Sequence, residues 1–169
     1  RARISPTPYF IHILGKTFTY LIICMIQFLL MVAVGIYLFP YMDLPQFDVT
    51  GKMFQLIVVT LFSGLAAIGF GVLLGTIADT QEQSAPFGAT SVVVLAAIGG
   101  IWVPVFLMPE FMQSVAKFSP MNWGLNAYYD IILRNSGIGG IAKELTFLFL
   151  FYLAMVGISL IYERKQNAV

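Results

Sequence analysis

Four long stretches of the chain contain no charged residue, and apolar side chains dominate each of them. They cover residues 17–42, 53–78, 83–109 and 145–162. A helix that crosses the hydrocarbon core of a bilayer needs about 20 mostly apolar residues, because each residue adds about 1.5 Å to its length. The pattern therefore predicts four transmembrane helices, at residues 17–39, 53–78, 86–106 and 144–162.

Between the third and fourth predicted spans, the apolar runs give way to short amphipathic segments. Two segments occupy residues 110–118 and 122–135, and Ser119-Pro120 separates them. Asp130 and Arg134 are four residues apart, a spacing that favours an ion pair on a helix surface. Such segments can form a re-entrant hairpin under a cover of protein, or lie flat on the membrane. We expect an all-α integral membrane protein with four transmembrane helices and two short outer amphipathic helices that are candidates for re-entry.

The charged residues separate a basic, proline-containing lead-in at residues 1–16 from a transmembrane domain at residues 17–165. Four spans would place both ends of the chain on one side of the membrane. That side carries basic residues packed close to the spans, whereas the other side carries four basic residues spread through loops that also hold acids. Cytoplasmic loops are enriched in lysine and arginine, so we expect both ends in the cytoplasm. The basic residues on the expected cytoplasmic side are Arg1, Arg3, Lys16, Arg164 and Lys165.

The composition supports a membrane protein, because 59% of the residues are hydrophobic and only 10% are charged. Soluble domains carry about 25% charged residues. A net charge of +1 without a basic stripe argues against nucleic acid as a partner. Cys24 is the single cysteine, so no internal disulfide or cysteine metal cluster is expected. The sequence contains no glycine-rich phosphate loop, and we expect no ATP, other cofactor or metal on this chain.

No ionisable residue lies well inside any predicted span. Ion-coupled transporters usually place such residues there, facing the interior of the helix bundle. The single histidine, His12, precedes the first span, and we expect no catalytic residue. The pattern favours a transport protein that receives its energy from outside the membrane. Two alternatives remain open, namely a fragment of a secondary transporter or channel, and a membrane scaffold subunit that transports nothing.

The second predicted span carries small residues at every fourth position. Small residues let helix backbones approach closely in membranes, and GxxxG is the best-known form of this pattern. The spacing predicts close helix packing, and we favour contact within the subunit over a seam between two copies. The residues concerned are Ser63, Ala67, Gly71 and Gly75.

Several ordered sequence pieces resemble one family. The lead-in holds Ser5-Pro6 and then LGK at 14–16, and a glutamine-rich turn, GTIADTQEQ, follows at 75–83. Further along stand GGIWVP at 99–104, MP at 108–109 and FSPMNW at 118–123. In this order and spacing the chain resembles the C-terminal, four-span part of a type-2 ABC transporter permease, the membrane subunit of bacterial exporters. The chain opens on Arg1 rather than Met, and we expect a longer protein whose first two of six spans precede it.

The resemblance implies a permease subunit in the bacterial inner membrane that moves an amphipathic or lipid-like substrate by alternating access. It implies a separate ABC ATPase that binds ATP and Mg, a second permease subunit in a homo- or heterodimer, and contact with membrane lipid. The lead-in would dock on the ATPase through Arg1, Arg3, Tyr9, Phe10 and His12. The outer re-entrant region would include Pro104, Pro109, Ser119, Pro120 and Trp123. One face of the third span would line the pathway, through Phe87, Thr90, Val94 and Ile98.

Overall fold

The computed structural model describes residues 9–44, 49–78 and 80–166, and the regular elements within these residues are all helical. The α-helices are α1 (Tyr9–Ala33), α2 (Met53–Ile77), α3 (Gln81–Ile98), α4 (Glu110–Ala116), α5 (Pro120–Ile132) and α6 (Ile138–Gln166). The shorter helical pieces are the π-helix η2 (Val34–Leu38) and the 3-10 helices η3 (Phe39–Met42) and η4 (Val105–Leu107). The expected all-α class is confirmed for the described part of the chain.

Three of these helices are long and apolar enough to cross a membrane. Within the described residues they are Ile11–Met42, which continues α1 through η2 and η3, then Met53–Ile77 and Ile138–Lys165. The third predicted span differs, because its apolar helix covers only Ser84–Ile98. A helix of this length reaches about 22 Å, less than the roughly 30 Å of the hydrocarbon core. The expectation of four full spans is therefore met only in part, by three candidate spans and one shorter helix.

The third predicted span was expected at residues 86–106, but α3 begins at Gln81 and ends at Ile98. Gly100 has a φ of 92°, a left-handed conformation that ends a helix and that glycine adopts without strain. Pro104 then precedes the short helix η4. The residues after Ile98 are as apolar as those before it, so hydrophobicity alone does not mark this helix end.

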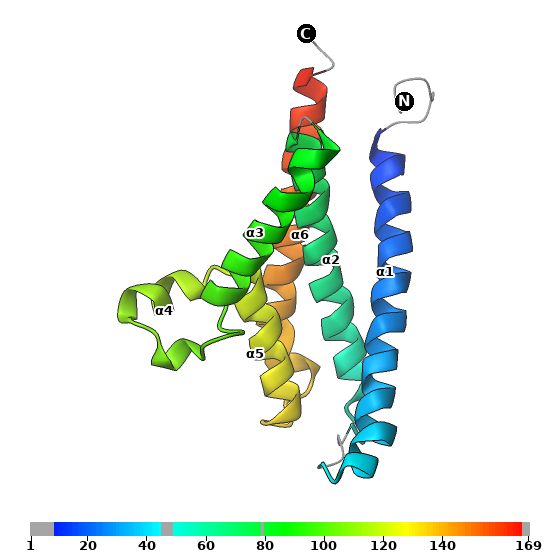
Figure 1. Cartoon of the computed structure of the whole chain (residues 1–169), viewed down its shortest axis with the longest axis vertical. Coiled ribbons are helices and arrows are strands. Elements are labelled where there is room, and N and C mark those ends of the chain that lie inside the picture. Colours follow the sequence, from blue (N-terminus) through cyan, green and yellow to red (C-terminus); the bar gives the residue numbers. More distant parts are fainter. Residues whose placement is uncertain (1–8, 45–48, 79, 167–169) are drawn as a thin grey trace.

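The long helices run side by side along the length of the molecule, and the start of α1 and the end of α6 lie at the same end (Figure 1). Helix α1 leads away from this end, α2 returns to it, and α6 returns a second time. The most extensive packing joins α2 to α6, followed by α5 to α6 and α1 to α2. Helix α3 descends from the end of α2, α4 projects sideways from the bundle, and α5 continues toward the far end.

Two small apolar clusters hold the bundle together. The larger cluster joins α2, α5 and α6 in the half of the molecule away from the end of α6, and the smaller one joins α1 and α6 in the other half. Much of the remaining helix surface exposes large apolar side chains, as at Phe18 and Met31. Lipid tails are as apolar as these side chains, so such a surface suits a membrane-embedded bundle. The buried members of the larger cluster are Leu56, Val59, Ala127, Ile131, Ile141 and Leu145.

Candidate functional site

Next to α2, two shorter helices, α3 and α5, together cover the length that one transmembrane helix would cover. We call this pair the divided crossing, and the point where the two helices meet is the break. Helix α3 runs beside the second half of α2, where a side-chain Cβ at Gly88 would lie 3.8 Å from Leu74. Helix α5 covers the first half of α2, where the hydroxyls of Thr60 and Tyr128 are 2.7 Å apart. The two helices meet beside Ser63, ten residues after the start of the 25-residue helix α2. The break therefore lies about 15 Å along a helix of about 37 Å, close to half depth.

Polar side chains at the start of α5 hold the end of α3. Asn122 Nδ2 donates to the Gly99 carbonyl oxygen at 3.2 Å, and Ser119 Oγ donates to the Leu95 carbonyl oxygen at 3.4 Å. Both side chains are buried. The Gly99 carbonyl oxygen lies just beyond the last residue of α3, and Asn122 supplies its donor. The Leu95 carbonyl oxygen accepts from the Gly99 N–H at 2.7 Å as well as from Ser119. At the break, these hydrogen bonds join the end of α3 to the start of α5 inside an otherwise apolar bundle, and we call this set of contacts the polar junction.

Glycine is needed at this junction because the two helices approach closely. A Cβ added at Gly99 would lie 2.6 Å from Met121 Cβ and 2.8 Å from the Leu95 carbonyl oxygen. At Gly100 it would lie 2.7 Å from a methyl group of Val105. These distances are shorter than real Cβ contacts, so a larger residue at Gly99 would push α3 and α5 apart.

An apolar cavity of about 250 Å³ opens beside the break. A cavity of about 150 Å³ with aliphatic and aromatic walls stays dry and holds benzene, so this one has room for a larger apolar group. The polar side chains of the lining are Ser63 and Tyr128. The Tyr128 hydroxyl bonds to Thr60, whereas the buried Ser63 Oγ has no hydrogen-bond partner among the described residues. All four helices around the break contribute to the walls. The lining includes Ala66, Phe70, Val92, Leu95, Met121, Leu125, Leu148 and Phe151.

The segment between α3 and α5 leaves the bundle, carries α4 and returns (Figure 1). Its aromatic side chains face outward, and Phe106, Phe111 and Phe118 are each more than 75% exposed. The residues predicted for an outer re-entrant region lie in this segment and at the start of α5, and their outer, re-entrant position stays a prediction. Pro104 and Pro109 precede η4 and α4, Ser119 precedes α5, and Pro120 occupies its first turn, where proline fits because no N–H is needed.

Trp123 fixes the start of α5 to α6. Its ring centroid lies 5.3 Å from that of Phe147 and 6.3 Å from that of Phe151. Its indole Nε1 donates to the Lys117 carbonyl oxygen at 2.7 Å. One side chain therefore connects the end of the projecting segment to the continuous helix α6.

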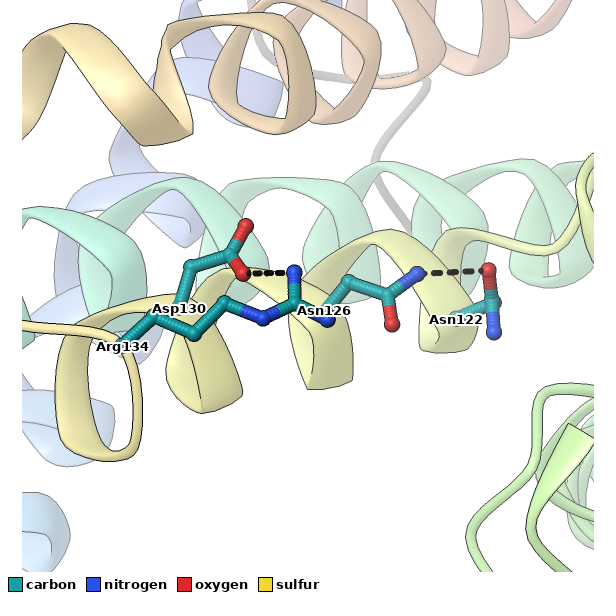
Figure 2. A network of polar contacts seen from close by, with 4 residues as sticks. All are labelled: Asn122, Asn126, Asp130 and Arg134. Atoms are coloured by element: carbon teal, nitrogen blue, oxygen red, sulfur yellow. Dashed lines mark hydrogen bonds and ion pairs between the residues drawn. The ribbon is translucent and has the colours of Figure 1, made fainter. Parts of the chain in front are cut away.

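A row of polar side chains follows α5 from the break toward the far end (Figure 2). Asn126 Nδ2 donates to Asn122 Oδ1 at 3.0 Å, and Arg134 pairs with Asp130 at 2.5 Å. The four residues are spaced four apart, so they lie along one side of the helix. The expected pair of Asp130 with Arg134 is present. The separate pair of Asn126 with Asn122 was not predicted, and its signal in the sequence is the same four-residue spacing.

Three of the predicted ATPase-docking residues lie at the start of α1, where Tyr9 and Phe10 begin the helix and His12 follows. Arg1 and Arg3 fall outside the described residues. His12 is exposed and borders a groove between α1 and α2. Their docking role stays a prediction.

The predicted pathway face of α3 does not line the cavity. Phe87, Thr90 and Val94 are exposed and Ile98 is partly buried, whereas α3 contributes Val92 and Leu95 to the cavity. A residue that is exposed in this chain can face lipid or a second subunit. The pathway role of this face stays a prediction.

The small-residue stripe of α2 is divided between two hollows. Ser63 and Ala67 border the cavity, while Gly71 and Gly75 border the groove between α1 and α2, where an added Cβ would meet nothing within 4 Å. The close contacts of α2 fall at two other glycines. A Cβ at Gly64 would lie 3.2 Å from the sulfur of Cys24, and one at Gly69 would lie 2.8 Å from the Tyr152 ring.

Comparisons with known proteins agree with this architecture. A family model described as "ABC-2 type transporter" matches residues 1–133. The linearmycin resistance permease protein LnrN of Bacillus subtilis is 30% identical over 83 residues, which are 49% of this chain and 21% of that protein. The probable multidrug ABC transporter permease YbhR of Escherichia coli is 25% identical over 137 residues, 80% of this chain and 35% of that protein.

A third relative is the putative transport permease YvfS of Bacillus subtilis. It is 27% identical over 109 residues, which are 64% of this chain and 43% of that protein. This chain therefore spans less than half the length of each of these relatives. No solved structure gives a significant match.

Proposed function

This chain belongs to the ABC-2 type transporter family, and on that premise we propose that it forms part of the permease subunit of an ATP-driven exporter. In this proposal a separate ATPase hydrolyses ATP, and two permease subunits enclose the path. The cargo is amphipathic or lipid-like and moves by alternating access. The names of two relatives, a linearmycin resistance permease and a probable multidrug permease, support a drug as the class of cargo.

The observation that carries the proposal is the broken crossing of α3 and α5 at half depth. Secondary transporters commonly place substrate sites near the bilayer midplane, where helices are discontinuous, and in this proposal an ATP-driven exporter uses the same geometry. Here the apolar cavity of about 250 Å³ adjoins the break. Drug-sized ligands occupy about 300–1,000 Å³, so the cavity suits one apolar portion of an amphipathic molecule rather than a whole drug. A crossing that is already divided can also tilt in two pieces without breaking a continuous helix.

The source of energy follows from the charge distribution. Residues 17–42, 53–78 and 145–162 contain no charged side chain through which an ion gradient would act. The start of α1 and the end of α6 lie together at one end of the bundle, which in this proposal faces the ATPase. The docking residues are Arg1, Arg3, Tyr9, Phe10 and His12, and this end faces the cytoplasm of a bacterial inner membrane.

The test uses the full-length permease with its ATPase in proteoliposomes. We expect ATP-dependent movement of a fluorescent amphipathic dye, and no movement with an ion gradient alone. Exchanging Tyr9 or Phe10 for Asp should lower dye-stimulated ATP hydrolysis several-fold, because a charge would be placed in an apolar docking contact. Dye movement driven by an ion gradient in the absence of the ATPase would overturn the proposal.

A further inference from the structure

A second hollow lies between α1 and α2, toward the start of α1, and has a volume of about 460 Å³. One wall carries His12, Lys16 and Tyr20, which recur every fourth residue along α1. The other wall is the bare face of α2 at Ala67, Gly71 and Gly75. We refer to this hollow as the α1–α2 groove.

The groove lies where α1 and α2 are farther apart than at their point of close contact. At that point an added Cβ at Gly64 would lie 3.2 Å from the sulfur of Cys24. Toward the start of α1 the two helices diverge (Figure 1), and the buried side chain of Ile13 packs in a cluster with Val72 at one side of the groove. Beside this contact α2 presents Gly71 and Gly75, where an added Cβ would meet nothing within 4 Å. In a bilayer the groove is therefore open to a guest about as wide as a lipid tail.

The groove changes from basic to apolar along its length. Gly75 and Gly71 lie two and six residues before the end of α2, about 3 and 9 Å from it, and the headgroup region is about 5–7 Å thick on each side of a bilayer. Gly75 therefore lies at the level of the headgroups and Gly71 at the edge of the hydrocarbon core. Lys16 lines the same groove, and its long side chain can extend its ammonium to the headgroup level. Among the described residues this ammonium has no ion-pair partner. The wall contains no acidic side chain, and its deeper part is formed by Ala67, Ile68 and Tyr20. A cation at the headgroup level above an apolar floor complements a negatively charged lipid.

We propose that the α1–α2 groove binds an anionic phospholipid of the leaflet that faces the start of α1. The Lys16 ammonium contacts the phosphate, and one acyl chain lies along the face of α2 left bare by Gly71 and Gly75. Basic pockets between transmembrane helices are known to hold anionic headgroups. This inference is separate from the proposed transport cargo, which is assigned to the cavity at the α3–α5 break. The inference also assigns a role to Gly71 and Gly75, where an added Cβ would meet nothing within 4 Å.

The test counts bound lipid on the full-length permease in complex with its ATPase. The complex is extracted from membranes that contain phosphatidylglycerol, and native mass spectrometry measures the lipid retained. Lys16→Gln removes the cation and should lower retained phosphatidylglycerol about fivefold, the effect of one basic residue at a membrane surface. Gly71→Leu fills the groove with a side chain and should abolish specific retention.

Matched variants serve as controls. Lys165→Gln removes an exposed charge at the same end of the molecule and should leave retention unchanged. Gly157→Leu adds the same side chain to α6, where an added Cβ meets nothing within 4 Å, and should also leave it unchanged. Thermal melting of each complex verifies folding, and Gly71→Ala gives a smaller change at the same open position.

Three results would overturn the inference. Retention could be equal in Lys16→Gln and in the wild type, or phosphatidylcholine could be retained as well as phosphatidylglycerol. The wild type could also carry no lipid while Gly71→Leu separates the permease subunits, which would mean that a protein helix occupies the groove. ATP-dependent dye movement in the same preparations is read separately, so a failed transport assay does not bear on the lipid site.

Discussion

The two neighbours of α2 on its cavity side differ in continuity. Helix α6 (Ile138–Gln166) is one unbroken helix that packs along α2 and buries Ile141, Leu148 and Tyr152. The α3–α5 crossing is divided at half depth, leaves much of α3 exposed and encloses a cavity. Regions with few buried contacts open at lower free energy than packed cores. The comparison indicates a rigid frame of α2 and α6 beside a crossing that is built to rearrange.

The largest effect is expected from Gly99→Ala, which attacks the divided crossing directly. The added Cβ would lie 2.6 Å from Met121 Cβ and close to a backbone oxygen that cannot move away alone. Overpacking of this kind costs about 1–3 kcal/mol, and this site should fall at the upper end. Thermal unfolding of the full-length complex measures the loss, and ATP-dependent dye movement should fall with it. Gly157→Ala, at an open helical position, is the control. Equal melting temperatures for the two variants would show that the junction is not tightly packed.

The second prediction tests the rigid frame and uses two glycines of the same helix. Gly69→Ala places a Cβ 2.8 Å from the Tyr152 ring, where α2 meets α6, and should destabilise the complex by about 1–2 kcal/mol. Gly71→Ala meets nothing within 4 Å and should be neutral or slightly stabilising, because alanine favours helix. The difference in thermal unfolding between the two variants is the measurement. The reverse order would mean that the open face of α2 is the packed one in the full protein.

The third prediction concerns the polar junction. Asn122→Ala leaves the Gly99 carbonyl oxygen without its donor and removes the acceptor of Asn126. We expect a loss of about 1 kcal/mol in stability, the lower end of the cost of leaving a buried acceptor unsatisfied, because the bond is long at 3.2 Å and no steric clash is added. If the junction moves during transport, the rate of ATP-dependent dye movement should change more than stability does. Ser119→Ala removes the longer, weaker bond and should have a smaller effect on both measurements.

The sequence alone predicts the continuous parts of this fold better than the divided part. Long uncharged runs of 18 to 26 mostly apolar residues mark α1, α2 and α6, because few structures other than a membrane-spanning helix accommodate such runs. The same reasoning fails after Ile98, where the chain stays apolar through Leu107 although the helix has ended. The end of α3 is marked by local signals, namely the Gly99-Gly100 pair and Pro104. These residues do not interrupt the hydrophobic pattern, so the pattern does not reveal the helix end.

The pattern of small residues shows a related limit. A four-residue spacing identifies Gly71 and Gly75 as one face of α2, but it does not say whether another helix lies on that face. The contacts fall instead at Gly64 and Gly69, whose neighbours Cys24 and Tyr152 are distant in sequence. The docking of α5 on α3 through Asn122 likewise depends on the path of the chain between them. Spacing within one helix therefore predicts a face, and only the arrangement of the helices decides what covers it.

The smallest effect is expected at the far end of the divided crossing, from Arg134→Gln. The Arg134 side chain is 75% exposed and that of Asp130 is 14% exposed, and the two residues are four apart on one helix. Helix pairs at this spacing contribute about 0.3–0.5 kcal/mol when water reaches the cation, and salt weakens them. We therefore expect a shift in thermal unfolding near the limit of detection, and smaller still at high salt. A loss well above about 1 kcal/mol that persists at high salt would place this end of α5 in a dry contact, because removing one partner of a buried ion pair is costly. In that case a second subunit or another part of the full protein would cover the outer half of the divided crossing, and the row from Asn122 to Arg134 would face protein rather than water.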